Sequence, residues 1–185
     1  MKLTVTKRPG TRKSEAKEIR RKGNIPAILY SAGKPCENIE IEGTQFKTIL
    51  REIKAGRLST TKFVLDQDGK ERYAIVKDIQ YHPTTYQILH LDFEELIEKN
   101  LVNVKVPILC VGMAECSGIK LGGFLRQVIR TVKVECLPQD MPTEFVIDVR
   151  DLGIRQSKRL RDLAFPKNVR PLARVEEVVV VIAKR

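Results

Sequence analysis

The sequence contains no tryptophan and only two histidines, and aromatic residues make up 5% of its 185 positions. Its four cysteines, Cys36, Cys110, Cys116 and Cys136, include no C-x-x-C pair, so neither a zinc site nor a redox motif is indicated. No apolar run approaches the ~20 residues of a membrane-spanning helix, and the first residues lack the apolar core of a signal peptide. We therefore expect a cytoplasmic protein with no membrane partner and no metal or other cofactor.

Motifs of the common enzyme classes are also missing. There is no G-x-S-x-G elbow, no P-loop and no G-x-G-x-x-G that opens a helix. A site built from His90, Asp92 and a cysteine nucleophile is an alternative, but such an i, i+2 pair arises easily by chance. None of the cysteines lies in a cationic turn that would activate its thiol. We expect a protein that is not an enzyme.

What the chain has is positive charge, with 34 Lys and Arg against 23 Asp and Glu and a net charge of +11. Residues 1–30 hold nine basic and two acidic residues, a local charge of +7. Residues 31–97 hold nine and eleven (−2), and residues 98–185 hold sixteen and ten (+6). A basic excess concentrated in one short segment is typical of proteins that bind a polyanion. A solvated basic surface that serves solubility is the alternative.

Alternating apolar residues predict a mostly β protein with a few short helices. In the first half, strand patterns cover residues 2–7, 25–30, 39–41, 63–66, 73–79 and 86–93. From Thr44, apolar residues at helical spacing predict an amphipathic helix: Phe46, Ile49, Leu50 and Ile53. Short strands with frequent turns predict a small β-barrel domain over residues 1–95.

The charged segment 94–100 interrupts the alternation and marks the expected domain boundary. Beyond it, alternating apolar residues recur at 102–106, 132–136 and 145–149, and a continuous apolar run covers 178–182. These patterns predict a separate β-rich domain over residues 96–185, with Cys136 facing inward.

A short basic helix is expected between Ser14, which can cap its start, and Gly23, which suits the position beyond its end. Its basic residues recur at i, i+4, i+7 and i+8 and so share one face: Lys13, Lys17, Arg20 and Arg21. A guanidinium fork matches phosphate oxygens, so this face predicts contacts with a phosphate backbone.

A second set of residues favours RNA as the polyanion. In the strand 90–93, His90 and Asp92 face one way while the apolar residues between and after them face the other. Tyr30 ends another short apolar strand. Tyrosine and histidine can stack on unpaired bases, and a carboxylate can accept from a base amino group or a 2′-hydroxyl. The alternative is that Tyr30 and Asp92 have ordinary structural roles at a strand end and on the surface.

Several blocks match one protein family. In the first domain they are Arg8, Arg20-Arg21-x-Gly-x-Ile-Pro-Ala-Ile-Leu-Tyr30, Asp78-Ile79-Gln80-x-His82-Pro83 and His90-Leu91-Asp92-Phe93. Weaker blocks in the second are Gly118-x-x-x-Gly122-Gly123-x-Leu125, Val134-Glu135-Cys136-Leu137-Pro138, Ile147-Asp148-Val149 and Asp162-Leu163. Together they resemble the 5S rRNA-binding protein family of the bacterial large ribosomal subunit (number twenty-five), in its long two-domain form, the CTC or general stress protein type.

The resemblance implies an N-terminal β-barrel that binds 5S rRNA, and a single copy that lies beside other proteins and rRNA of the large subunit. It implies RNA-contacting residues at Arg8 or Arg12, at Arg20 or Arg21, and at Tyr30, His90 and Asp92. With Lys13 and Lys17 these form the predicted RNA-binding set. A nonspecific RNA-binding stress protein that acts off the ribosome is the alternative.

The chain departs from the family pattern at two places. Tyr81 stands before His82, where the family usually has a basic residue, which removes one phosphate contact. In the second domain, a small acidic turn of the family is replaced by the basic segment 155–161. We predict that a second basic patch there contacts RNA or a neighbouring ribosomal protein: Arg155, Lys158, Arg159 and Arg161.

Overall fold

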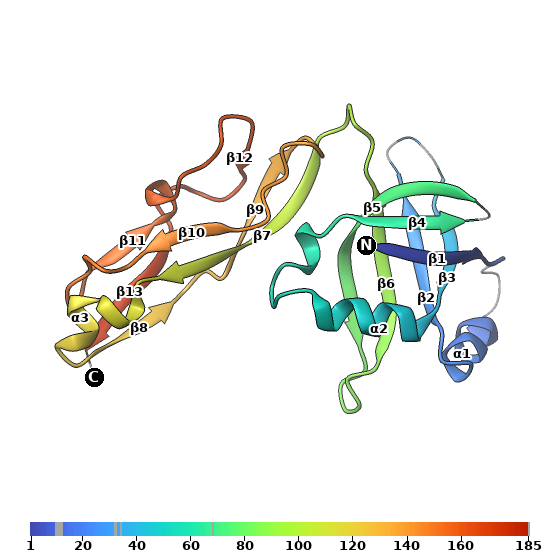
Figure 1. The fold of residues 1–185 in the computed structure, drawn as a ribbon, viewed down its shortest axis with the longest axis horizontal. Helices are drawn as coiled ribbons and strands as arrows, with labels where there is room; N and C mark the ends of the chain where they lie inside the picture. The colour runs from blue at the N-terminus through green and yellow to red at the C-terminus, as the bar shows by residue number, and fades with distance from the viewer. Residues whose placement is uncertain (10–12, 32, 34, 68, 185) are drawn as a thin grey trace. The chain divides into compact units, whose positions relative to one another are not determined.

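The structure, a computed structural model, describes residues 1–9, 13–31, 33, 35–67 and 69–184 (Figure 1). The chain forms two compact units, Met1–Asn100 and Leu101–Arg185. Both are built mainly from β-strands joined by short helices and turns, which confirms the predicted fold class.

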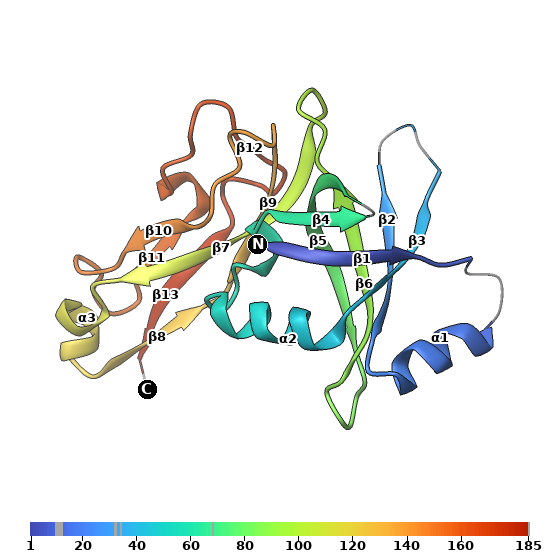
Figure 2. The ribbon, with the colours of Figure 1, turned by 45° about the vertical axis from the view of Figure 1, so that its right-hand side comes forward.

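Six strands of the first unit form a closed barrel, in the order β1-β3-β2-β6-β5-β4 (Figures 1 and 2). Their bounds are β1 Lys2–Lys7, β2 Ile25–Tyr30, β3 Glu37–Ile41, β4 Phe63–Gln67, β5 Lys70–Tyr81 and β6 Ile88–Glu95. Neighbours pair antiparallel except β2 with β6 and β1 with β4, which are parallel. The β1–β4 pair closes the barrel, and the predicted barrel is confirmed.

The barrel interior is filled by every second residue of the strands, as the alternation predicts. Phe63 lies at its centre, stacked on Phe46 with ring centroids 6.3 Å apart and edge-on to Phe93 at 5.9 Å. Phe46 comes from α2 (Gly43–Glu52), the predicted amphipathic helix, whose Ile49 also packs against the core. Because α2 and the short helix η1 (Leu58–Thr60) connect the end of β3 to the start of β4, they lie at that end of the barrel.

The predicted basic helix is α1 (Lys13–Arg21), in which Ile19 is buried. It begins before Ser14, so Ser14 lies within its first turn instead of capping it. Gly23 lies just beyond the end of the helix, as predicted, and its φ of 86° is the left-handed conformation that glycine adopts without strain. The N–H of Gly23 donates to the carbonyl of Arg20 at 3.1 Å. The end of α1 thus directs the chain straight into β2.

Among the strands of the barrel, β6 begins later than predicted. The pattern predicts a strand from Tyr86, but β6 begins at Ile88 and Tyr86 lies in the preceding turn with a φ of 53°. The turn is ordered by His82, whose Nδ1 accepts hydrogen bonds from the backbone N–H groups of Thr84 (3.3 Å) and Thr85 (3.2 Å). Tyr86 is 78% exposed. An aromatic residue next to a strand reads like part of it when only local alternation is considered.

The second unit contains a four-stranded sheet, β10-β7-β9-β12, and a three-stranded sheet, β11-β13-β8. The strands are β7 Val102–Val111, β8 Gly123–Gln127, β9 Thr131–Cys136, β10 Phe145–Asp148, β11 Ser157–Arg159, β12 Arg170–Pro171 and β13 Val178–Lys184. The short helices are η2 Met113–Glu115, α3 Ser117–Lys120 and η3 Leu160–Asp162. The alternating valines of β7 and β9 and the predicted inward Cys136 are buried.

Candidate nucleic-acid interface

The parallel pairing of β2 with β6 places the predicted base-contacting residues on one outer face of the barrel. Ile28 is the Cα partner of Asp92, and Tyr30 is that of Glu94. Since Leu29 and Leu91 point into the core, Tyr30, His90 and Asp92 all point outward from neighbouring strands. The structure therefore brings Tyr30 beside His90 and Asp92, which are about sixty positions away in the sequence.

His90 and Asp92 form a hydrogen-bonded pair on this face. The His90 Nδ1 lies 2.7 Å from the Asp92 Oδ1, and both side chains are partly exposed. An ionised carboxylate can only accept a hydrogen bond, so the Nδ1 atom carries the hydrogen and donates it. The bond fixes the imidazole ring and leaves its Nε2 atom for a ligand.

Tyr30 is half-buried beside three carboxylates. Burial, followed by the negative charges of Glu94, Asp92 and Asp78, raises the pKa of Tyr30 to about 12. The phenol therefore stays protonated at neutral pH and keeps its O–H donor. Such a donor suits a phosphate oxygen or a 2′-hydroxyl.

We expect Tyr30 to dominate the most alkaline step of tyrosine ionisation. Because its folded-state pKa of about 12 lies above the ordinary value of 10, the folded chain keeps a proton that the unfolded chain loses. The contribution of Tyr30 to the free energy of unfolding is therefore fully present below pH 10 and is lost as the pH rises from 10 to about 12. Tyrosinate absorbance during an alkaline titration should show this step, and Tyr30→Phe should remove it. If Tyr86→Phe, a change at an exposed turn residue, removes the same step, the assignment to Tyr30 is wrong.

The helix α1 supplies exposed positive charge beside β6. The Arg20 Nε donates to the carbonyl of Leu89 at 3.0 Å, next to His90 in the sequence. Lys17 and Arg21 are exposed. The Arg20 contact connects the basic helix to the strand that carries His90 and Asp92.

The remaining predicted residues lie before or at the start of this helix. Arg8 follows β1 and is partly buried, and its Nε donates to the carbonyl of Ile39 at 3.2 Å. This contact uses one of the guanidinium donors to anchor Arg8 on β3. Lys13 is the first residue of α1, and Arg12 lies outside the described residues.

The structure adds β5 residues that the sequence reasoning did not assign to the site. Asp78 is the Cα partner of Asp92, and Gln80 is that of His90, so both point outward beside the pair. A bulge at Lys77 shifts the register immediately before them. The sequence signal for these two residues is the block Asp78-Ile79-Gln80, which belongs to the family pattern.

Comparison with known proteins gives matches in both units. Residues 3–93 match the model of the ribosomal L25p family, and residues 101–185 match that of the ribosomal protein TL5 C-terminal domain. Proteins named large ribosomal subunit protein bL25 from Chlamydia abortus and Chlamydia trachomatis serovar L2 are each 45% identical to the chain. That from Chlamydia pneumoniae is 44% identical, and all three alignments cover 185 residues and the full length of both chains. The chain belongs to the bL25 family.

Membership in the bL25 family confirms the family resemblance of the sequence blocks. This is a family of structural, non-enzymatic proteins of the large ribosomal subunit, so the prediction that the chain is not an enzyme is confirmed. Ribonucleoprotein and rRNA-binding character follow from the family. The two-unit architecture corresponds to the long bL25 form, because a separate family model matches the second unit.

The second unit of this bL25 chain holds the predicted basic patch, but carboxylates lie among the cations. Arg159 forms an ion pair with Glu176 at 2.8 Å, and Arg161 approaches the same carboxylate at 3.4 Å. Lys158 lies in β11, and Arg155 is exposed with a φ of 66°. Glu176 therefore offsets part of the charge that the sequence pattern indicates.

Other kinds of site find no support in the residues that the structure describes for this bL25 chain. Within them, no group of three or more His, Cys, Asp or Glu residues is arranged to hold a metal ion. Among the helices of the same residues, none is long and apolar enough to cross a membrane. Cys116 and Cys136 are buried, and burial raises the pKa of the Cys110 thiol, which disfavours the reactive thiolate.

Proposed function

We propose that this chain is a structural component of the large ribosomal subunit that binds 5S rRNA through the first unit. The names of its chlamydial relatives assign those proteins to the large ribosomal subunit. The hydrogen bond between Arg20 and the Leu89 carbonyl carries the proposal for the site, because it joins a basic helix to the strand of His90 and Asp92. Phosphate-binding and base-contacting groups thus form one continuous surface.

The charges on this surface divide the RNA contacts into two kinds. The exposed cations of α1 suit phosphates, which supply affinity without reading sequence. Over β2, β5 and β6, the carboxylates Asp78 and Asp92 repel phosphates but accept hydrogen bonds from base amino groups and 2′-hydroxyls. Tyr30 and His90 add rings for stacking. We therefore expect bases or sugar edges over the strands and the RNA backbone along α1.

Competition binding tests the proposal. We expect the full chain to prefer 5S rRNA to tRNA at two salt concentrations. If five phosphates are neutralised, a plot of log affinity against log salt concentration should have a slope of roughly −4. Replacing Arg21 by glutamine should make that slope shallower by about one unit, whereas Lys105→Gln, at an exposed position of the second unit, should leave it unchanged. Equal binding of the two RNAs would identify a generic polyanion-binding surface and contradict the proposal.

The basic patch of the second unit has its own test. Changing Arg155, Lys158, Arg159 and Arg161 together to serine is expected to reduce association with ribosomes or large subunits severalfold. Because Glu176 already offsets part of this charge, we expect a smaller loss than that from changes in the first unit. Cosedimentation with large subunits at two salt concentrations measures it. Unchanged cosedimentation would show that the patch is only a solvated surface.

A further inference from the structure

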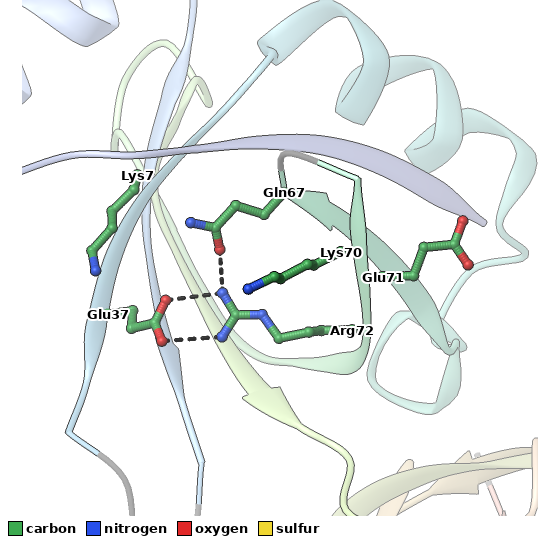
Figure 3. A pocket seen from close by; sticks show the side chains of 6 residues that line it. All are labelled: Lys7, Glu37, Gln67, Lys70, Glu71 and Arg72. Atoms are coloured by element: carbon green, nitrogen blue, oxygen red, sulfur yellow. Dashed lines mark hydrogen bonds and ion pairs between the residues drawn. The ribbon is translucent and has the colours of Figure 1, made fainter.

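A polar cavity lies at the end of the barrel opposite α2. The helix connects the end of β3 to the start of β4, whereas this cavity lies where β1 and β4 end and where β3 and β5 begin. It has a volume of about 520 Å³. We refer to it as the barrel-mouth pocket; it is lined by Lys7, Glu37, Gln67, Lys70, Glu71 and Arg72 (Figure 3).

Most of the lining residues stand at strand positions that face the barrel interior. Arg72 is the Cα partner of buried Leu65, and Glu37 is that of buried Leu29. Directly opposite residues of antiparallel strands point to the same side. The same parity applies to Lys7, Gln67 and Lys70. At this end of the barrel, the inward-facing side chains therefore change from apolar to charged or polar from one inward position to the next.

Arg72 is held rigidly within the pocket. Its Nη1 and Nη2 donate to the two carboxylate oxygens of Glu37 at 3.1 and 2.9 Å, and Nη2 also donates to the Gln67 side chain. A guanidinium has five N–H donors. Three are used in this way, so two of them, one on Nε and one on Nη1, have no partner among the described residues. The group is thus already oriented for a further acceptor.

Two lysines of the pocket have no ion pair among the described residues. In the part of the chain that the structure describes, neither Lys7 nor Lys70 forms an ion pair, although both line the pocket. Glu71 is engaged by Lys2 at 3.0 Å, and in Figure 3 it points away from Arg72. Three cations therefore line a space with two carboxylates, and each carboxylate already has a partner: Glu37 is bound by Arg72 and Glu71 by Lys2.

We propose that the barrel-mouth pocket binds a phosphate group. Lys7 and Lys70 would approach it as mobile ammonium donors, and Arg72 would donate from its fixed guanidinium. Ammonium groups are compact point charges that suit a tetrahedral phosphate, while the planar fork of Arg72 is already taken by a carboxylate. The phosphate comes either from an RNA backbone or from inorganic phosphate in solution. None of the residues that line this pocket is Tyr30, His90 or Asp92.

A titration with inorganic phosphate at constant ionic strength tests the pocket directly. The full chain is compared with the double variant Lys7→Gln/Lys70→Gln and with a matched control, Lys54→Gln/Lys62→Gln, which removes two exposed charges from the same unit. We expect saturable NMR shifts of the Lys7, Lys70 and Arg72 signals in the wild type and control, and an affinity lower by about tenfold or more in the double variant. Absence of saturable shifts in the wild type, or equal affinity in the double variant, would overturn the proposal.

The salt dependence of RNA binding separates the two sources of phosphate. If an RNA phosphate occupies the pocket, the log–log salt slope of the double variant should be shallower than that of the control by about one unit. Equal slopes, together with the pocket shifts, would assign the pocket to free phosphate. Because the titration contains no RNA, its result does not depend on whether the protein prefers 5S rRNA.

Discussion

Replacing Tyr30, His90 and Asp92 together by alanine is expected to remove the preference for 5S rRNA over tRNA while leaving a salt-dependent affinity for both. Phosphate contacts position an RNA without reading it, whereas base contacts specify it. Stacking of one base on an aromatic ring is worth about 1–3 kcal/mol. We therefore expect the preference to fall by roughly two orders of magnitude or more. Competition between the two RNAs at fixed salt concentration measures the change.

A matched variant distinguishes lost contacts from lost structure. Thr4→Ala/Thr6→Ala/Tyr73→Ala removes three exposed side chains, one of them aromatic, from other strands of the same barrel. It should keep the preference, and both triple variants should remain folded by circular dichroism because none of the six side chains belongs to the buried core. If the first variant still prefers 5S rRNA, the base-contacting site lies elsewhere.

The second large effect is expected in the barrel core. Phe63 is fully buried and contacts two other rings, so Phe63→Ala should lower the free energy of unfolding of the first unit by about 3–5 kcal/mol. A domain of this size is typically stable by about 5–15 kcal/mol, so the variant should be marginally folded. Urea titration followed by circular dichroism measures the loss, since the chain has no tryptophan to report by fluorescence.

Phe124→Ala is the control for this change. Phe124 lies in β8 of the second unit and is 49% exposed, so its removal should change stability by only about 0.5 kcal/mol. Phe63→Ala should also weaken binding to 5S rRNA, because the proposed site is built on the destabilised barrel. An unchanged urea midpoint for the first unit would contradict the packing described for the three rings.

Local alternation predicted the faces of the strands well. Inward Leu91 and Phe93 and outward His90 and Asp92 follow from a period of two, which requires only neighbouring residues. The end of α1 just before Gly23 is equally local, because it depends on one residue that adopts positive φ easily.

Pairing between distant strands could not be predicted in this way. The parallel register that places Ile28 beside Asp92 depends on a contact across more than sixty residues, for which the sequence carries no local signal. The bulge at Lys77 has the same origin, and it determines which side of β5 Asp78 and Gln80 occupy. Glu37 and Arg72 read as ordinary surface charges at strand ends, although the barrel turns both toward its interior.

The β1–β4 pair that closes the barrel also determines whether the N-terminus can be shortened. Terminal residues usually tolerate trimming or fusion, but β1 is bonded to β3 on one side and to β4 on the other. Even the carbonyl of Met1 accepts the N–H of Val64 at 2.8 Å. Removal of the first seven residues would leave β3 and β4 as two free edges, which invite pairing with other chains. For this protein, a truncated N-terminus is a route to aggregation.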